Sequence, residues 1–162
     1  MTINRAIGGV SVLIVLVLAY SWWSSDERVI RRRLDELAAA ASVPAVEGDL
    51  ERVARLPRLA GYLAADVRVR HGELTIESRE SLLAAIGLWR PQPGGVTVEF
   101  VDVQVAVGED ASRAEIYLTA TITSRDAAGG SIVDAREATI TMAKREGEWV
   151  VARAEAMETL RR

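Results

Sequence analysis

The feature of this sequence that most constrains its fold is a change of hydrophobic period near residue 96. Before this point, apart from residues 67–76, apolar residues recur every three to four positions, whereas afterwards they alternate with polar residues along segments 96–107, 114–123, 132–143 and 149–157. The first period is typical of helices and the second of strands with one buried face. Short loops join these segments and favour an antiparallel meander. The loop at 126–130 ends in a glycine pair, and the loop at 145–147 contains Glu-Gly. The sequence therefore predicts an α+β fold, with helices packed on one face of the sheet.

Two helices are predicted ahead of the first strands. The first begins at a capping box formed by Ser24 and Glu27. The second covers residues 49–65, has Asp49 as a plausible N-cap, and is expected to be kinked or split at Pro57. The apolar face of the first helix consists of Ile30, Leu34, Leu37, Ala38 and Ala41, and that of the second of Leu50, Val53, Leu56, Leu59 and Leu63.

A short hairpin and a third helix lead into the meander. Residues 67–76 alternate around a His-Gly pair at 71–72, which is typical of a tight turn. Ser78 opens a third helix, and the segment 91–95, rich in proline and glycine, closes it. The apolar residues of this helix are Leu82, Leu83, Ile86 and Leu88.

The N-terminal segment predicts a membrane anchor. Residues 6–23 carry no charge and, as a helix, span roughly 27 Å, close to the hydrocarbon thickness of a bilayer. Tyr20, Trp22 and Trp23 cluster at its end, where aromatic rings favour the headgroup interface. The alternative is a cleavable signal peptide, with Arg5 as its positive region. We favour an uncleaved single-pass anchor for two reasons. The apolar run is long, and the only pair of small residues that could form a cleavage site near its end, Ala19 and Ser21, is followed directly by two tryptophans.

This interpretation divides the chain into a short tail (1–5), a transmembrane helix (6–23), one domain (24–158) and a charged tail (159–162). The arginines that follow the segment favour a cytoplasmic domain by the positive-inside rule. An N-terminal signal anchor, however, usually sends the large domain across the membrane. We expect an extracytoplasmic, periplasmic domain, with the cytoplasmic orientation as the alternative.

Composition excludes several kinds of site. The chain has no cysteine and a single histidine, so disulfides, thiolate chemistry and a two-histidine zinc site are excluded. No calcium-loop motif is present, and we expect no metal and no cofactor. A net charge of −3 is unlike that of nucleic-acid binders.

The basic run Arg31, Arg32 and Arg33 lies close to the predicted anchor and allows two interpretations: contact with anionic lipid headgroups, or a solvated helix face.

The order of elements resembles the nuclear transport factor 2-like superfamily, also called SnoaL-like or cystatin-like. Five short strings carry the resemblance, which covers roughly residues 26–155: Gly-Asp-Leu at 48–50, Leu-Ala-Ala-Asp-Val at 63–67, Glu-Ser-Arg-Glu at 77–80, the strand 96–103, and Arg-Glu-Gly-Glu-Trp-Val-Val at 145–151. The resemblance implies a cone-shaped pocket between a curved antiparallel sheet and the helices, and commonly a homodimer formed through the open sheet face. Its members include isomerases, cyclases and dehydratases as well as non-catalytic modules, so the fold does not determine function.

Individual site residues follow from this resemblance and from the strand pattern. In the isomerases the general base lies on the first short strand, at a place held here by His71 or Arg70, but the family's oxyanion donors are not matched at Thr139 and Ile140 or in the first helix. His71 is thus a weak catalytic candidate, and a turn residue facing solvent is the alternative. Strict alternation places Val101, Val103, Val105 and Val107 on one face of the strand and Phe100, Asp102 and Gln104 on the other. Pocket or interface candidates are Phe100, Asp102, Gln104, Tyr117, Arg136 and Glu137.

These observations favour a non-enzymatic domain at a membrane surface. We expect it to act through protein contacts, as a homodimer or with a membrane-protein partner, or by binding a small apolar ligand. The alternative is an enzyme using acid–base chemistry on a small hydrophobic substrate, which requires His71 or Tyr117 beside a carboxylate such as Asp102 or Glu137 in one cavity. A third hypothesis is a lipid-headgroup binder that uses the arginines at 31–33.

Overall fold

The structure, a computed structural model, describes residues 26–89, 94–125 and 130–157. Residues 26–41 form a helix, which continues into α2 (Asp49–Ala60) through a short loop. The remaining elements are β1 (Leu63–His71), β2 (Leu74–Ile76), α3 (Arg79–Leu88), β3 (Val96–Val107), β4 (Arg113–Arg125), β5 (Ser131–Arg145) and β6 (Glu148–Ala156). The predicted anchor at 6–23, the capping residue Ser24 and both predicted tails lie outside the described residues. Within the described ranges, no helix is long and apolar enough to cross a membrane.

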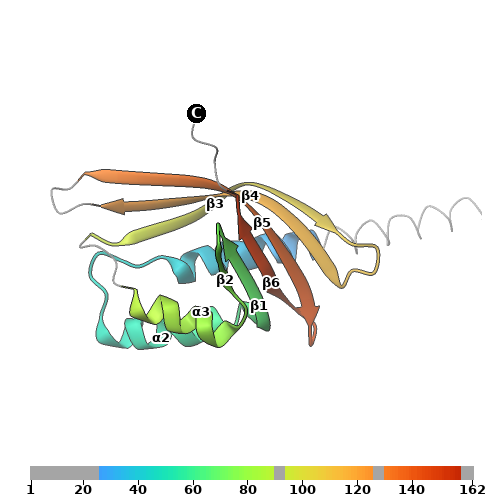
Figure 1. Cartoon of the computed structure of the whole chain (residues 1–162), viewed down its shortest axis with the longest axis horizontal. Helices are drawn as coiled ribbons and strands as arrows, with labels where there is room; N and C mark the ends of the chain where they lie inside the picture. Colours follow the sequence, from blue (N-terminus) through green and yellow to red (C-terminus); the bar gives the residue numbers. More distant parts are fainter. Residues whose placement is uncertain (1–25, 90–93, 126–129, 158–162) are drawn as a thin grey trace, which may run out of the picture.

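The sheet has six strands in the order β2-β1-β6-β5-β4-β3. Strands β3 to β6 form the predicted antiparallel meander, and the predicted hairpin supplies β1 and β2. The prediction of an all-antiparallel sheet was wrong, because β1 lies parallel to β6. The sheet bends strongly, and the helices cover its concave side (Figure 1). Three helices on a six-stranded mixed sheet confirm the predicted α+β class for the described residues.

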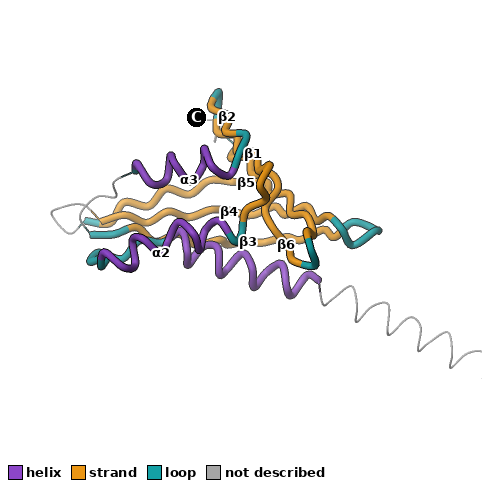
Figure 2. The backbone as a smooth tube through the Cα atoms, turned by 90° about the horizontal axis from the view of Figure 1, so that it is seen from below, coloured by secondary structure: helices purple, strands orange, loops and turns teal. Residues whose placement is uncertain are grey.

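The hydrophobic core lies between the helix of residues 26–41 and one half of the sheet. Ile30 and Leu34 are fully buried, which confirms the predicted apolar face of this helix. They belong to one cluster with Ile116, Met142 and Trp149 from β4, β5 and β6. Figure 2 shows this helix running under the long strands, with α2 and α3 at the end away from residue 26.

Polar contacts fasten the start of the same helix to the sheet. Asp26 accepts hydrogen bonds from Lys144 Nζ at 2.9 Å and from Trp149 Nε1 at 3.1 Å. Partial burial by itself raises the pKa of Asp26, but these two hydrogen bonds and the charge of Lys144 outweigh it and lower the pKa. The buried indole of Trp149 therefore has a charged acceptor, as a buried N–H requires.

The second helix differs from its prediction in length. It ends at Ala60 rather than near residue 65, because residues 63–65 belong to β1. Gly61 N–H donates to the carbonyl of Arg58, which tightens and closes the last turn. Pro57 lies inside α2 without splitting it. Its ring removes one hydrogen bond to the carbonyl of Val53, a residue on the solvent side of the helix, where water can satisfy that group.

The face that α2 turns inward was also predicted wrongly. Leu50 is 87% exposed and Val53 is 74% exposed, whereas Leu59 is buried and Arg55 is only 9% exposed. Arg55 and Leu59 are four residues apart and so share one side of the helix. Tertiary packing thus places a charged residue inward and two apolar residues outward, against the sequence pattern.

A β-bulge interrupts β3. The pairing with β4 shifts between Val101 and Gln104, and Asp102 has a positive φ of 54°. The extra residue at the bulge changes which side chains of the strand point to which face of the sheet. Phe100 and Val103 are therefore both directed inward, although residues three positions apart in a regular strand lie on opposite faces. The predicted grouping of Phe100 with Asp102 and Gln104 was therefore wrong, because strict alternation ignores a bulge. Arg31 Nη1 donates to the carbonyl of Val103 at 2.8 Å and supports the bulge from the helix.

Candidate functional site

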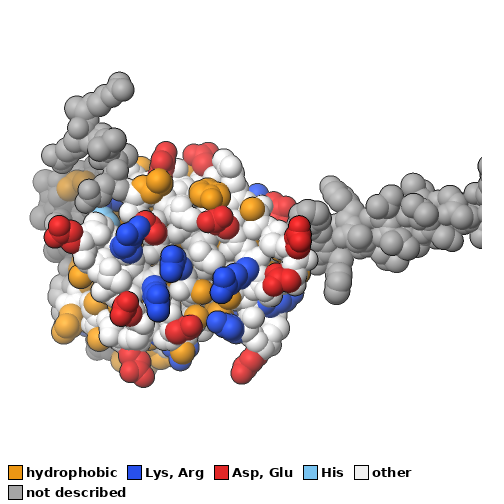
Figure 3. Space-filling view, turned by 45° about the vertical axis from the view of Figure 1, so that its right-hand side comes forward, with side chains coloured by type: hydrophobic (Ala, Val, Ile, Leu, Met, Phe, Trp, Pro, Cys, Tyr) orange, Lys and Arg blue, Asp and Glu red, His pale blue; other side chains and the backbone are white. Residues whose placement is uncertain are grey.

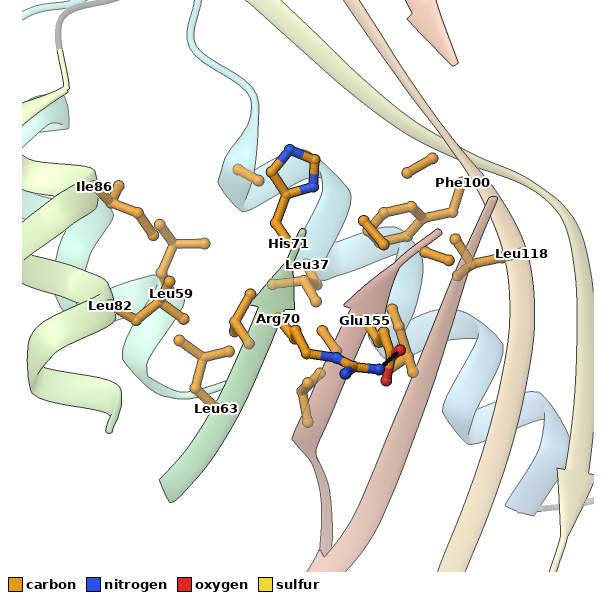
Figure 4. A pocket seen from close by; sticks show the side chains of 18 of the residues that line it. Leu37, Leu59, Leu63, Arg70, His71, Leu82, Ile86, Phe100, Leu118 and Glu155 are labelled. Atoms are coloured by element: carbon orange, nitrogen blue, oxygen red, sulfur yellow. Dashed lines mark hydrogen bonds and ion pairs between the residues drawn. The ribbon is translucent and has the colours of Figure 1, made fainter. Parts of the chain in front are cut away.

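A cavity of about 410 Å³ lies between the concave side of the sheet and the helices. In Figure 4, Leu59, Leu82 and Ile86 on α2 and α3 form one side, and Phe100 and Leu118 on the sheet form the other. The volume falls within the range of roughly 300–1,000 Å³ that is common for small-molecule sites. The cavity is lined by Leu37, Ala41, Arg55, Leu59, Leu63, Val69, Arg70, His71, Leu82, Ile86, Trp89, Phe100, Leu118, Ala120, Ala138, Ile140, Val151, Ala154, Glu155 and Ala156.

The cavity exists because small side chains face it from adjacent strands. Ala138 on β5 is paired with Leu118 on β4 and with Ala156 on β6. Ala154 on β6 is paired with Ile140 on β5. These alanines occupy positions where larger residues would fill the space under α2 and α3. The signal in the sequence is the repeated alanine at inward positions of the last strands.

Four lining residues are charged or titratable: Arg55, Arg70, His71 and Glu155. Arg70 and Glu155 form an ion pair between β1 and β6. His71 is exposed at the end of β1, and its Nε2 lies 3.1 Å from Arg136 Nη1. A guanidinium has only N–H donors, so this contact requires Nε2 of a neutral imidazole to accept. The lone pair that a general base would use is therefore directed at Arg136.

Arg136 in turn holds its own partner on β5. Its Nε donates to Asp134 Oδ2 at 3.0 Å. Asp134 and Arg136 have the same inward facing as Ala138, and with His71 they form a chain of polar contacts beside the cavity. We call His71, Arg136 and Asp134 the edge cluster. Of the predicted candidates on the strands, Phe100 lines the cavity and Arg136 belongs to the edge cluster.

The other predicted candidates lie elsewhere. Asp102 is the bulge residue, and Gln104 is paired with Tyr117 on the outer, convex face of the sheet. Glu137 is also on that face, opposite Thr119. Tyr117 is 49% exposed, and its hydrogen bond with Glu115, followed by the charge of Glu115, raises the pKa of the phenol. The structure thus separates Tyr117 and Glu137 from His71 by the thickness of the sheet.

Arg55, like Glu155, is a charged cavity residue that the sequence did not predict. Its Nη1 lies 3.4 Å from Glu47 Oε1, and the other carboxylate oxygen of Glu47 lies 3.4 Å from Arg52 Nε. Glu47 thus serves two arginines. The buried Nε of Arg55 has no hydrogen-bond partner within the described part of the chain. No local signal marks this residue, because its burial depends on how α2 is laid against the sheet.

The basic run at 31–33 makes structural contacts. Arg31 binds Glu27 at 2.8 Å in addition to the bulge carbonyl. Arg33 pairs with Glu148 and lies over the ring of Tyr62, 5.1 Å from its centroid. Arg32 is the most exposed of the three and lies 3.8 Å from Glu36. In Figure 3, acidic side chains surround the basic ones on the face in view, so this face carries mixed charge.

Among the described residues, no group of three or more His, Asp or Glu side chains is placed to hold a metal ion. The cavity wall is nearly all carbon, and its carboxylate, Glu155, is already paired with Arg70. The chemistry that the arrangement supports is burial of an apolar molecule, with the Nε donor of Arg55 open to an acceptor.

No protein-family model matches the sequence, and no curated protein is detectably similar to it. Solved structures do resemble the fold. An NTF2-like protein with a cystatin-like fold from Novosphingobium aromaticivorans has a TM-score of 0.67 and 15% identity, covering 86% of each chain. A protein provisionally named a dehydratase of the NTF2-like family, from Streptomyces avermitilis, has a TM-score of 0.65 and 16% identity, covering 85% of this chain and 99% of its own.

The association domain of CaMKII from C. elegans is also similar, with a TM-score of 0.55 and 14% identity over 85% of this chain and 95% of that one. At these identities the similarity establishes architecture and leaves activity open. The order of elements, the bent mixed sheet and the cavity beneath its helices agree with this architecture. The described part of the chain therefore has the nuclear transport factor 2-like, or cystatin-like, fold.

Proposed function

We propose that this domain is a non-catalytic binding module that takes a small apolar ligand into its cavity. The observation that carries the proposal is the cavity of about 410 Å³, whose wall is apolar apart from four residues. Burying apolar ligand surface against such a wall contributes about 25 cal/mol per Å². A cavity of this size maintained by inward alanines is typical of a binding site rather than of a filled core.

The arrangement of polar groups favours binding over acid–base catalysis. An enzyme of the alternative kind requires a free base together with donors for a developing negative charge. The lone pair of His71 is directed at Arg136, and Glu155 is paired with Arg70. Tyr117 and Glu137 are on the far side of the sheet.

The test is photolabelling of the full chain in lipid nanodiscs with an uncharged aryl diazirine. Labelled peptides are mapped by mass spectrometry, which separates labelling in the cavity from labelling in lipid. We expect saturable labelling of peptides that contain Leu82, Phe100 or Leu118, because these side chains line the cavity. Labelling of these peptides that rises linearly with probe concentration would contradict the proposal.

A matched pair of variants on β5 controls this experiment. Ala138→Phe places a ring in the cavity, whereas Ala135→Phe places the same ring on the exposed convex face of the same strand. We expect Ala138→Phe to abolish saturable labelling and Ala135→Phe to leave it unchanged. Equal effects of the two variants would mean that the label does not report the cavity.

A second candidate function, assembly through the convex face of the sheet, rests on a separate observation. Val101, Tyr117 and Val133 are exposed there on neighbouring strands, and one structural neighbour is an association domain. The chain has no cysteine, so a single-cysteine variant reports a symmetric contact cleanly. We expect Tyr117→Cys to form a disulfide-linked dimer on mild oxidation, and Glu109→Cys, in an exposed turn, to form none. Equal crosslinking of both variants would count against a dimer through this face.

We further propose that residues 6–23 hold the domain at the membrane as a single-pass anchor, with the domain on the extracytoplasmic side. Its uncharged, apolar sequence supports this. The full chain is expected in the membrane fraction, resistant to carbonate extraction, and Leu13→Arg with Leu16→Arg is expected to release it. Protease added to intact spheroplasts should digest the domain. Protection of the domain until lysis would reverse the orientation.

A further inference from the structure

We propose that the ligand of the cavity carries one carboxylate, and that Arg55 binds it. This inference rests on the proposed ligand-binding function and adds the chemical class of the ligand. The class is an apolar body, either an acyl chain or a compact ring system, with a single anionic group at one end. The observation behind it is a nine-tenths-buried arginine in a cavity wall that is apolar apart from this residue, Arg70, His71 and Glu155.

The position of Arg55 is unusual for its side-chain type. A guanidinium stays charged at all physiological pH values, and burying it is unfavourable unless anions and hydrogen bonds compensate. Apolar residues were available on the same helix, yet Leu50 and Val53 point to solvent while Arg55 lines the cavity. The fold thus brings a fixed positive charge to the place where a ligand would lie.

Glu47 compensates this charge incompletely. Its Oε1 lies 3.4 Å from Arg55 Nη1, a long contact for an ion pair, and its Oε2 lies 3.4 Å from Arg52 Nε. One carboxylate is therefore shared by two guanidinium groups. The buried Nε of Arg55 has no hydrogen-bond partner within the described part of the chain. A buried donor without an acceptor is costly, and an incoming acceptor relieves that cost.

The geometry of arginine favours a carboxylate as that acceptor. Nε and one terminal nitrogen present two parallel N–H groups, which match the two oxygens of a carboxylate. The apolar remainder of the cavity then surrounds the rest of the ligand, from Leu59 beside Arg55 on α2 to Phe100 and Leu118 on the sheet. Arg70 also lines the cavity, but Glu155 already neutralises it.

The test compares two probes that differ only in the end group. A twelve-carbon chain with an aliphatic diazirine is used as its carboxylic acid and as the matching alcohol, with the full chain in nanodiscs. We expect half-maximal cavity labelling at an at least about tenfold lower concentration for the acid than for the alcohol, a ratio equivalent to about 1.4 kcal/mol. Arg55→Gln is expected to remove this preference while labelling by the alcohol persists, which also shows that the cavity is still formed.

Two further variants separate the role of Arg55 from general effects of charge. Arg58→Gln removes an exposed arginine of the same helix that does not line the cavity, and it should leave the preference for the acid intact. Glu47→Gln removes the competing carboxylate and should increase the preference. A decrease in Glu47→Gln would overturn the proposal, even if Arg55→Gln failed to fold.

The outcomes distinguish failure of this inference from failure of the proposed function. If neither probe labels the cavity saturably, the ligand-binding function itself fails. If both probes label it equally and Arg55→Gln changes nothing, the cavity binds apolar ligands but the carboxylate assignment is wrong. Competition by dodecanoate and by 2-naphthoate then shows whether an acyl chain or a compact ring fits the apolar part.

Discussion

The two halves of the concave sheet surface are built from similar strands but differ in what lies on them. Under the helix of residues 26–41 the surface is filled by large side chains, and Ile30, Leu34 and Trp149 are essentially inaccessible to solvent. Under α2 and α3 it is lined by alanines, and α3 buries none of its residues fully. We call these the packed half and the cavity half. The difference indicates that the packed half contributes more to stability, and it is the basis of the binding role proposed for the cavity half.

The largest effect that we expect is a loss of unfolding free energy when a large side chain is truncated in the packed half rather than in the cavity half. Leu34→Ala removes a fully buried side chain from the packed half and should lower the free energy of unfolding by about 2–5 kcal/mol. Leu82→Ala, in the half-buried wall of the cavity, should lower it by less than about 1.5 kcal/mol. Urea unfolding followed by circular dichroism measures both. Similar losses would mean that the two halves do not differ in packing.

Overpacking tests the same contrast in the opposite direction, on a single strand. Ala114 and Ala120 both face inward from β4, but Ala114 is buried in the packed half and Ala120 lines the cavity. Ala114→Leu should cost about 1–3 kcal/mol, because the core has no room for the added atoms. Ala120→Leu should be close to neutral in urea unfolding. A cost for Ala120→Leu as large as that for Ala114→Leu would argue against an open cavity.

The pH dependence of stability should report the packed half through Asp26. Its folded pKa is lowered, so the carboxylate contributes stability above its unfolded pKa of about 4, and this contribution is lost as pH falls through the lower, folded value. Asp26→Asn should reduce the free energy of unfolding at pH 7 by roughly 1 kcal/mol and flatten its dependence on pH below about 4. An unchanged acid limb in the variant would show that Asp26 is not the group that titrates.

The smallest predicted effect concerns the boundary between the halves, where Arg31 supports the bulge. Arg31→Gln loses the hydrogen bond to the carbonyl of Val103 and should cost about 0.5–1.5 kcal/mol. It should also increase hydrogen exchange of the amides next to Asp102. Arg32 is exposed and pairs with Glu36 on its own helix, so Arg32→Gln should change stability by less than about 0.5 kcal/mol. Equal exchange in the two variants would show that the bulge holds without Arg31.

Expectations from local periodicity were confirmed within the described residues for the extent of the meander strands and for the inward face of the helix of residues 26–41, but not for α2 or for the bulged part of β3. The strands of the meander lie where alternation placed them, and Ile30 and Leu34 face the core as the helical spacing predicted. Phe100 was a candidate from the sequence and lines the cavity, although its predicted grouping with Asp102 was wrong. Arg55 was not a candidate at all. The hydrophobic pattern of α2 does not predict which of its residues face inward, because that helix packs over a cavity instead of a filled core.

The sequence by itself determined the class of fold, since burial of one face forces a period of 3.6 on helices and of 2 on strands. Only the tertiary structure decided the parallel pairing of β1 with β6, the bulge at Asp102 and the burial of Arg55. Each of these depends on contacts between residues far apart in the chain, such as Arg31 with Val103. A local pattern carries no information about such contacts, because the free energy that selects them arises only when the elements are packed together.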